Sequence, residues 1–235
     1  MKSRPPTKAL GLSDGEFVCA KDGFAAHHLA KARQRVLLAG WGCRRRTLAD
    51  GRQQILSLIL PGDTLISSAG GDAICQSEIV ALTPMRLVDA GRWLETIDEK
   101  LSEATVRLEE HASYIEQALL LNHIVRLGCL NARERTAHLL LELHDRLCRV
   151  GVASDDGYKL PLKQEVLGDI LGLSIVHVNR TLQQLRHQRL ITLSLGEVNL
   201  LAKDQLIKMS GYASLSTFPG LSEAIPYDVA GYANN

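Results

Sequence analysis

Two short helical segments joined by one tight turn constrain the fold of this chain more than any other feature. The first helix is predicted over residues 163–171 and the second over residues 175–187, with Gly172 between them. Glycine tolerates the positive φ that such a turn requires, and Ser174 is placed to cap the second helix. The pattern predicts a helix-turn-helix, whose second helix can lie in the major groove of DNA.

A strand-turn-strand pattern follows at residues 192–200 and predicts a wing beside the second helix. From Lys159 to Lys203 the chain has six Lys or Arg and three Asp or Glu, although the formal net charge of the whole chain is only +1. Contact with DNA phosphates requires such a local excess of positive charge. An ordinary helical hairpin is the alternative interpretation of the motif, and the wing and the basic bias favour DNA binding over it.

The second helix divides into an apolar face and a face that offers hydrogen bonds and methyl groups. Arginine can bind guanine through two hydrogen bonds, Asn and Gln can bind adenine, and Ile or Val can contact the thymine methyl group. We therefore expect Arg180 to contact guanine and Lys163 to contact phosphate. The predicted DNA-binding residues are Lys163, Ser174, Ile175, Val176, His177, Asn179, Arg180 and Gln183.

A long helix without proline is predicted over residues 92–127, with Gly128 at its end. Its apolar residues recur in heptads, which is typical of a helix that pairs with a second copy of itself. One seam consists of Leu94, Leu101, Leu108, Ile115 and Asn122, and the other of Ile97, Ala104, His111, Ala118 and Val125. The predicted dimer interface is Leu94, Ile97, Leu101, Leu108, Ile115 and Asn122. Packing of this helix on its own domain is the alternative.

Residues 35–87 read as short strands separated by turns, which predicts an antiparallel roll or barrel. Asp50-Gly51 is a strong hairpin signal, and Pro61-Gly62-Asp63 ends a further apolar run. After the long helix, Asn131 and Glu134 have the spacing of a capping box and predict a new helix to about Val150. The predicted fold class is therefore α+β, with an N-terminal antiparallel β-roll, a long dimerisation helix and a C-terminal winged helix-turn-helix. The predicted divisions are 1–91, 92–130, 131–210 and a tail at 211–235.

The segment QEVLGDILGLSIVHVNRTLQQL, at residues 164–185, closely resembles the winged helix of the Crp–Fnr regulator superfamily, in a form common in alphaproteobacteria. WGCRRR at 41–46 and LADGRQQILSLILPGD at 48–63 resemble the cyclic-nucleotide-binding-type roll of that family. The resemblance covers roughly residues 35–203. It implies a homodimer on a near-palindromic site of double-stranded DNA, a sensor domain that acts through the long helix, and RNA polymerase as a further partner.

One departure from the family concerns its cyclic-nucleotide cassette, in which an arginine pairs with the cyclic phosphate. Residues 53–85 should contain that cassette, but they include no Lys or Arg and carry Asp63, Asp72 and Glu78. A buried phosphate without a cation or converging amides is costly. We therefore expect an effector other than a cyclic nucleotide, or none. The alternatives are a nucleotide-sensing member with a diverged cassette and a ligand-binding roll that does not bind DNA.

Other functional classes find little support. The five cysteines are scattered without a C-x-x-C pair, so no metal site or cofactor is predicted. No nucleophile elbow, metal-spaced His/Glu set or phosphate loop occurs, which argues against an enzyme. The first residues lack an apolar signal region, and no run of about 18 apolar residues occurs. We therefore expect a cytoplasmic protein without a membrane partner.

Overall fold

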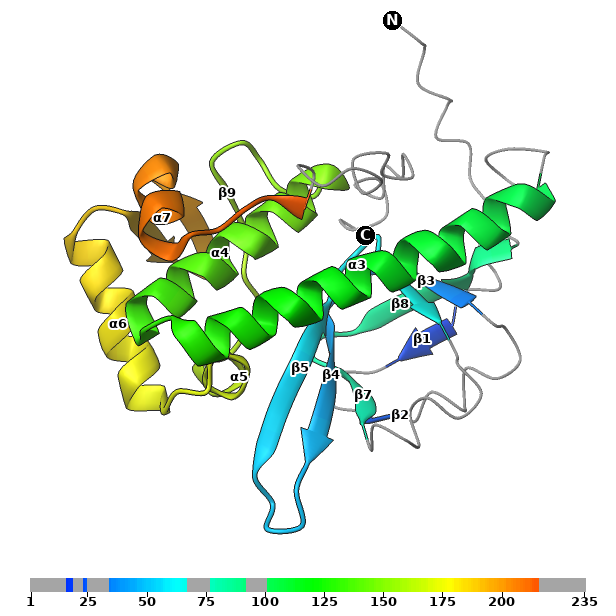
Figure 1. The fold of residues 1–235 in the computed structure, drawn as a ribbon, viewed down its shortest axis with the longest axis horizontal. Helices are drawn as coiled ribbons and strands as arrows, with labels where there is room; N and C mark the ends of the chain where they lie inside the picture. Colours follow the sequence, from blue (N-terminus) through cyan, green and yellow to red (C-terminus); the bar gives the residue numbers. More distant parts are fainter. Residues whose placement is uncertain (1–15, 19–22, 25–33, 67–76, 92–100, 216–235) are drawn as a thin grey trace, which may run out of the picture.

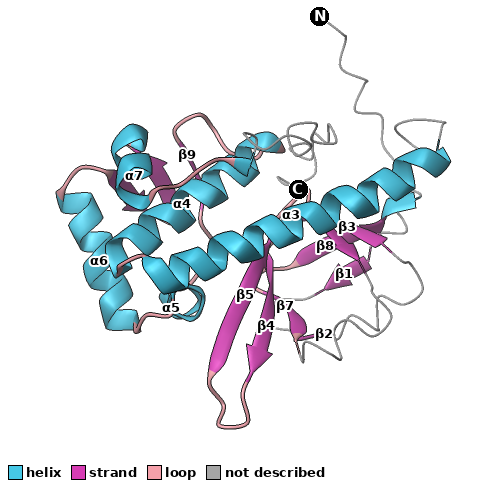
Figure 2. Cartoon of the chain, viewed as in Figure 1, coloured by secondary structure: helices cyan, strands magenta, loops and turns pink. Residues whose placement is uncertain are grey.

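The computed structural model describes residues 16–18, 23–24, 34–66, 77–91 and 101–215. Strands dominate the first part of the chain, one long helix crosses beside them, and a small domain of helices and short strands follows (Figures 1 and 2). The predicted α+β class and the order roll, long helix, winged helix-turn-helix are confirmed.

Two four-stranded antiparallel sheets form the roll. The first has the order β1 (Glu16–Val18), β8 (Met85–Asp89), β3 (Gln34–Ala39), β6 (Thr64–Ile66). The second has the order β2 (Gly23–Phe24), β7 (Glu78–Ala81), β4 (Gly42–Thr47), β5 (Gln53–Ile59). Apolar side chains from both sheets meet inside the roll, since successive residues of a strand point to opposite faces. This core consists of Leu37, Ile59, Leu65, Ile79, Ala81, Met85 and Leu87.

The predicted turns of the roll depend on glycine. Gly51, at the tip of the β4–β5 hairpin, has φ +86°, and the N–H of Leu48 donates to the carbonyl of Arg52 across the turn. Gly62, between β5 and β6, has φ +91°. A Cβ at Gly62 would lie 2.5 Å from Cγ1 of Val150, so this turn packs directly against the end of a later helix.

The long helix α3 (Leu101–Cys129) runs beside the roll, passes through Gly128 and ends two residues beyond the predicted range 92–127. Two residues separate it from helix α4 (Ala132–Arg149), which begins where the capping signal indicated. The Asn131 side chain accepts hydrogen bonds from the N–H groups of Arg133 and Glu134, and the Glu134 carboxylate accepts one from the N–H of Asn131. This reciprocal cap satisfies N–H groups that have no partner within the helix.

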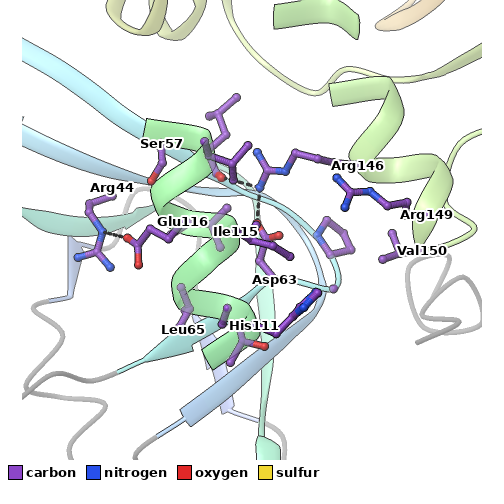
Figure 3. A pocket seen from close by; sticks show the side chains of 17 residues that line it. Arg44, Ser57, Asp63, Leu65, His111, Ile115, Glu116, Arg146, Arg149 and Val150 are labelled. Atoms are coloured by element: carbon purple, nitrogen blue, oxygen red, sulfur yellow. Dashed lines mark hydrogen bonds and ion pairs between the residues drawn. The ribbon is translucent and has the colours of Figure 1, made fainter. Parts of the chain in front are cut away.

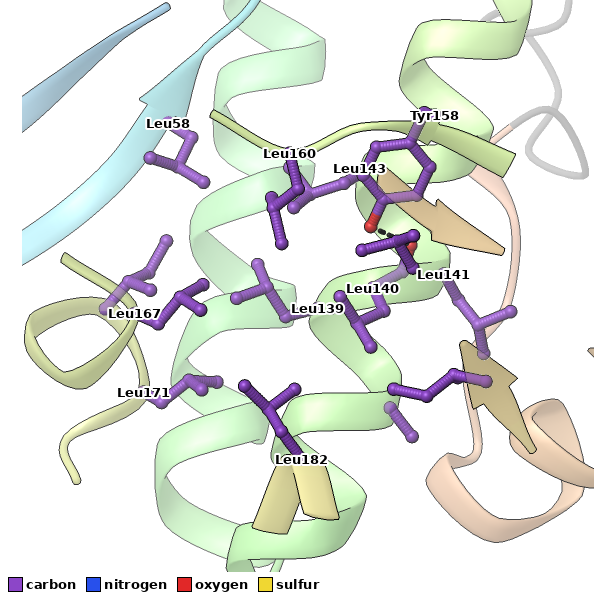
Figure 4. Close-up of a cluster of buried hydrophobic side chains, with 14 of the residues drawn as sticks. Leu58, Leu139, Leu140, Leu141, Leu143, Tyr158, Leu160, Leu167, Leu171 and Leu182 are labelled. Atoms are coloured by element: carbon purple, nitrogen blue, oxygen red, sulfur yellow. Dashed lines mark hydrogen bonds between the residues drawn. The ribbon is translucent and has the colours of Figure 1, made fainter. Parts of the chain in front are cut away.

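The C-terminal domain packs α4, α5 (Gln164–Leu171), α6 (Ile175–His187) and α7 (Lys203–Ser210) with a small sheet. The sheet has the order β10 (Ile191–Ser194), β11 (Glu197–Leu200), β9 (Gly157–Lys159). Leucines from α4, α5 and α6 contribute to its core, and the hydroxyl of the buried Tyr158 donates to the carbonyl of Leu140 over 3.0 Å (Figure 4).

The apolar core does not stop at the boundary between the roll and this domain. Leu58 and Leu60 of the roll belong to the same buried cluster as Leu139 and Leu167. Polar contacts join the same surfaces, since the Gln54 side-chain amide donates to the carbonyl of Asp169 over 2.8 Å. The two parts are therefore held as one packed unit in this structure.

A buried polar cluster lies where α3 meets α4, and we call it the elbow cluster. Arg126 of α3 has only 1% of its surface exposed, and its guanidinium pairs with the carboxylate of Glu142 on α4. Arg126 also donates to Nδ1 of His138 over 3.1 Å, and its Nη1 lies 3.4 Å from Nδ1 of His123. Burial, followed by the positive charge of Arg126, lowers the pKa of His123 and of His138 to about 4. The elbow cluster is Arg126, Glu142, His123 and His138.

The two histidines of the elbow cluster should make stability fall in mild acid. As pH decreases from their ordinary pKa of 6.5 toward 4, they bind protons in the unfolded chain but not in the folded one. Each should then reduce the free energy of unfolding by up to about 1.4 kcal/mol per pH unit in that window, and contribute nothing above it. Urea unfolding from pH 7 to pH 4 would measure the slope. Substituting both histidines with Gln should flatten it, whereas His177→Gln on the surface should not.

Candidate nucleic-acid interface

The turn between α5 and α6 has the geometry that its sequence predicts. Gly172 ends α5 in the left-handed conformation, with φ +63°. Gly168 lies where the chain doubles back, because a Cβ there would come within 2.7 Å of the carbonyl oxygen of Leu173. Gly172 therefore supplies the positive φ of the turn, and Gly168 permits a close approach that a larger residue would disturb.

Helix α6 begins at a side-chain cap and buries one face. The hydroxyl of Ser174 accepts a hydrogen bond from the N–H of His177 over 3.3 Å, as predicted. No acidic residue lies in the first turn of α6, so no carboxylate there would repel a phosphate backbone. The buried face consists of Val178, Thr181, Leu182 and Leu185.

The opposite face of α6 presents the predicted DNA-binding residues to solvent. Val176 is 78% exposed and Ile175 is 45% exposed, although both are apolar and lie in a well-capped helix. Asn179 is half-buried. The exposed members of the set are Lys163, Ser174, Ile175, Val176, His177, Arg180 and Gln183.

The wing is a tight hairpin beside α6. Strands β10 and β11 pair from Ile191↔Leu200 to Ser194↔Glu197. Its turn consists of Leu195 and Gly196, with φ +51° and +76°, and the Leu195 side chain is fully exposed. The predicted wing is therefore present, with β9 as an additional third strand.

The described part of α3 shows the surroundings of two residues of the predicted dimer seam, Ile115 and Asn122. Ile115 lines a cavity against the roll of its own chain, and Asn122 is half-buried. Leu94 and Ile97 lie outside the described residues, and Leu101 and Leu108 lie on α3 where side chains are not described. Among the residues of α3 whose side chains are described, the large exposed apolar ones are Tyr114, Leu121, Ile124 and Val125.

Three of these exposed residues, together with Ala118, give a heptad pattern in which one of the two predicted rows is shifted by one position. The spacing is 114, 118, 121, 125, so Ala118 and Val125 remain, while Tyr114 and Leu121 take the places of Ile115 and Asn122. Ile124 lies outside this pattern. The difference arises because α3 is apolar on two sides, and Ile115 and Leu119 face the roll.

Other kinds of site are not evident in the described part of the chain. No group of three or more His, Cys, Asp or Glu side chains is arranged to hold a metal ion among the described residues. None of the described helices has the length and hydrophobicity needed to cross a membrane.

Comparisons with known proteins agree with this geometry. Residues 134–209 match the Crp-like helix-turn-helix domain family. The nitrogen fixation regulation protein FixK of Bradyrhizobium diazoefficiens is 32% identical over 162 residues, which cover 66% of this chain and 65% of that protein. The transcriptional activatory protein AadR of Rhodopseudomonas palustris is 29% identical over 158 residues, covering 67% of this chain and 64% of AadR. The matched domain and these relatives support a relationship to the Crp–Fnr superfamily.

Solved structures of Crp–Fnr proteins share the fold. FixK2 from Bradyrhizobium japonicum aligns with a TM-score of 0.63 and 23% identity, over 85% of this chain and 98% of that structure. A transcriptional regulator of the CRP family from Thermus thermophilus aligns with a TM-score of 0.59 and 21% identity, also over 85% and 98%. The sequence relatives above are named as regulators, not as enzymes. The alignments to FixK and AadR span slightly less than two thirds of the length of those proteins.

Proposed function

We propose that this chain is a regulator of the Crp–Fnr superfamily, a sequence-specific DNA-binding protein that acts as a homodimer on a near-palindromic site. The observation that carries the proposal is the capped helix α6, which leaves Val176, His177 and Arg180 exposed beside a wing. Exposed apolar side chains on a short surface helix are costly in water but can contact thymine methyl groups in the major groove.

The proposed roles follow from the chemistry of each side chain. Arg180 contacts guanine, while Asn179 and Gln183 accept and donate hydrogen bonds at adenine. Ile175 and Val176 contact thymine methyl groups. Lys163, at the start of α5, contacts a phosphate, and so does Ser174. His177 contacts either a base edge or the DNA backbone.

Selection of duplexes from a random library tests the proposal. We expect a near-palindromic consensus, and an affinity that falls steeply as salt increases, because phosphate contacts release counterions. A protein that selects no motif, and whose binding does not depend on salt, would instead be a ligand-binding roll with an incidental helical hairpin.

We propose that two copies pair along the exposed seam of α3, defined as Tyr114, Ala118, Leu121 and Val125. The seam has the 4-3-4 spacing that lets two helices pack side by side. Leu121, which is 64% exposed, lies near its centre. Burial of these side chains against a second copy would remove them from water.

Leu121→Asp combined with Val125→Asp should convert the dimer to monomers, because four carboxylates would face one another across the seam. Sedimentation velocity at micromolar concentration measures the outcome. Ile115→Ala is the matched control, since Ile115 faces the roll, and this variant should remain dimeric. If only the Ile115→Ala variant dissociated into monomers, the result would favour the seam predicted from the sequence.

We propose that residues 1–91 act as a sensor whose effector is not a cyclic nucleotide. No Lys or Arg lies between Gln53 and Met85 to pair with a cyclic phosphate. Cyclic AMP and cyclic GMP at micromolar concentration should therefore leave the melting temperature unchanged. A saturable increase would favour the alternative, a nucleotide-sensing member with a diverged cassette.

RNA polymerase is the proposed protein partner, as the family membership implies. Transcription in vitro from a promoter that carries the selected motif tests this proposal. A change in transcript level that requires the motif would support it, and an unchanged level would contradict it.

A further inference from the structure

A cavity of about 120 Å³ lies where the roll, α3 and the last turns of α4 meet (Figure 3). Its walls come from both parts of the chain. The roll contributes Ile59 and the Pro61-Gly62-Asp63 turn, α3 contributes the segment from His111 to Leu119, and α4 contributes Arg146 and Arg149. A molecule in this cavity would touch the predicted sensor and the first helix of the DNA-binding domain at once.

Two acidic side chains of the cavity are already neutralised. Asp63 pairs with Arg146 and accepts a hydrogen bond from the N–H of Leu60 over 2.7 Å. Glu116 pairs with Arg44, with 3.3 Å between Oε1 and Nε. Three arginines and two carboxylates therefore line the space, so one lining arginine, Arg149, has no carboxylate partner among the lining residues.

Arg149 is paired instead with Asp145, which does not line the cavity. Its ion pair with Asp145 is long, at 3.5 Å, and Asp145 also accepts hydrogen bonds from the hydroxyls of Tyr212 and Ser214. Among the described residues, the buried Nε of Arg149 has no hydrogen-bond partner, and neither has the buried Nε of Arg146. The Arg146 side chain is only 6% exposed. Buried donors without an acceptor are costly, so the hydrogen-bonding capacity of both guanidinium groups is only partly satisfied.

The remaining walls suit an apolar body. Ile59, Leu65, Ile115 and Leu119 also line the space. His111 adds no positive charge near neutral pH, because burial and then the charge of Arg149 lower its pKa. An engineered apolar cavity of about 150 Å³ holds one benzene molecule, so this cavity has room for a ligand with about one ring and is too small for a nucleotide.

We propose that this cavity binds a small organic carboxylate, with the carboxylate on Arg149 and the apolar body against Ile115 and Leu119. Guanidinium groups recognise carboxylates through paired hydrogen bonds, and a partly desolvated site strengthens them. The cations that face the cavity come from β4 and α4, and none comes from residues 53–85, where the cyclic-nucleotide cassette of the family would lie.

Thermal unfolding of the full chain, at constant ionic strength, tests the site without DNA. Benzoate and hexanoate are the probes, and benzamide is the neutral match for benzoate. We expect at least one of the two carboxylates to raise the melting temperature saturably, by about 3 °C at about ten times its Kd, whereas benzamide should have a much smaller effect. Binding should also raise the pKa of His111, measured by NMR, because the carboxylate offsets the charge of Arg149.

Arg149→Gln should abolish the shift while the fold persists, because Asp145 keeps its two hydroxyl donors. Arg133→Gln, on the first turn of the same helix and away from the cavity, is the matched control and should respond as the wild type does. No saturable shift with either carboxylate, an equal shift with benzamide, or a shift that survives Arg149→Gln would each overturn the proposal. Because DNA is absent, none of these outcomes depends on the proposed regulator function.

Discussion

Replacing Glu142 with alanine is expected to lower the free energy of unfolding by about 3–5 kcal/mol. The substitution leaves the guanidinium of Arg126 buried without a carboxylate, since its other described partners are the neutral histidines His123 and His138. An uncompensated buried charge is among the most destabilising changes that a single substitution can cause. Urea unfolding at pH 7 measures the loss.

Two comparisons separate this electrostatic cost from the loss of packing. The double substitution Arg126→Met with Glu142→Leu should recover most of the stability, because it removes both charges and keeps apolar volume. Glu116→Ala breaks the more exposed pair with Arg44 and should cost at most about 1 kcal/mol. If the double variant were as unstable as Glu142→Ala, the destabilisation would come from loss of the ion pair and not from the unpaired charge of Arg126.

Arg180→Ala is expected to weaken specific DNA binding by about 1–3 kcal/mol per half-site and to relax the preference at one base pair in each half-site. Arg180 is exposed one turn beyond Val176, and no other Lys or Arg lies within the first two turns of α6. Binding measured on the selected site, and a repeated selection with the variant, give the affinity and the base preference.

Lys163→Ala is the control for a contact that carries no sequence information. It should weaken binding to all sequences alike and reduce the salt dependence, because it removes a phosphate contact. If Arg180→Ala left the selected motif unchanged and lowered affinity everywhere, Arg180 would be a phosphate contact. Specificity would then depend on Asn179, His177 and the methyl contacts of α6.

The helix-turn-helix could be predicted from local sequence because its determinants are local. Gly172 supplies the positive φ, Ser174 supplies the cap, and each lies next to the helix that it ends or begins. The same is true of the Asn131 cap. The seam on α3 was harder to predict, because the sequence of a helix with two apolar faces does not show which face packs against the roll of the same chain. That choice depends on Ile59 and Leu65, which are distant in sequence.

Features built from several distant residues were not predicted. The elbow cluster joins side chains up to 19 positions apart on two helices, and each member alone resembles an ordinary surface residue. Strands β1, β2 and β9 are two or three residues long, too short for an alternating pattern to appear. The sequence does mark β9 at Gly157, because a Cβ there would come within 2.2 Å of the Asn199 side chain of the neighbouring strand β11.

The stiffness of the joint between α3 and α4 has a consequence for the DNA target. Only two residues separate the helices, the second helix is capped, and Arg126 is buried in the bend, where it pairs with Glu142. In a dimer built on α3, the distance and rotation between the two copies of α6 are then set by this bend, with no linker to absorb a change. Each added base pair rotates one half-site by about 35° and moves it about 3.4 Å. The protein would thus measure the length between half-sites as strictly as it reads their bases.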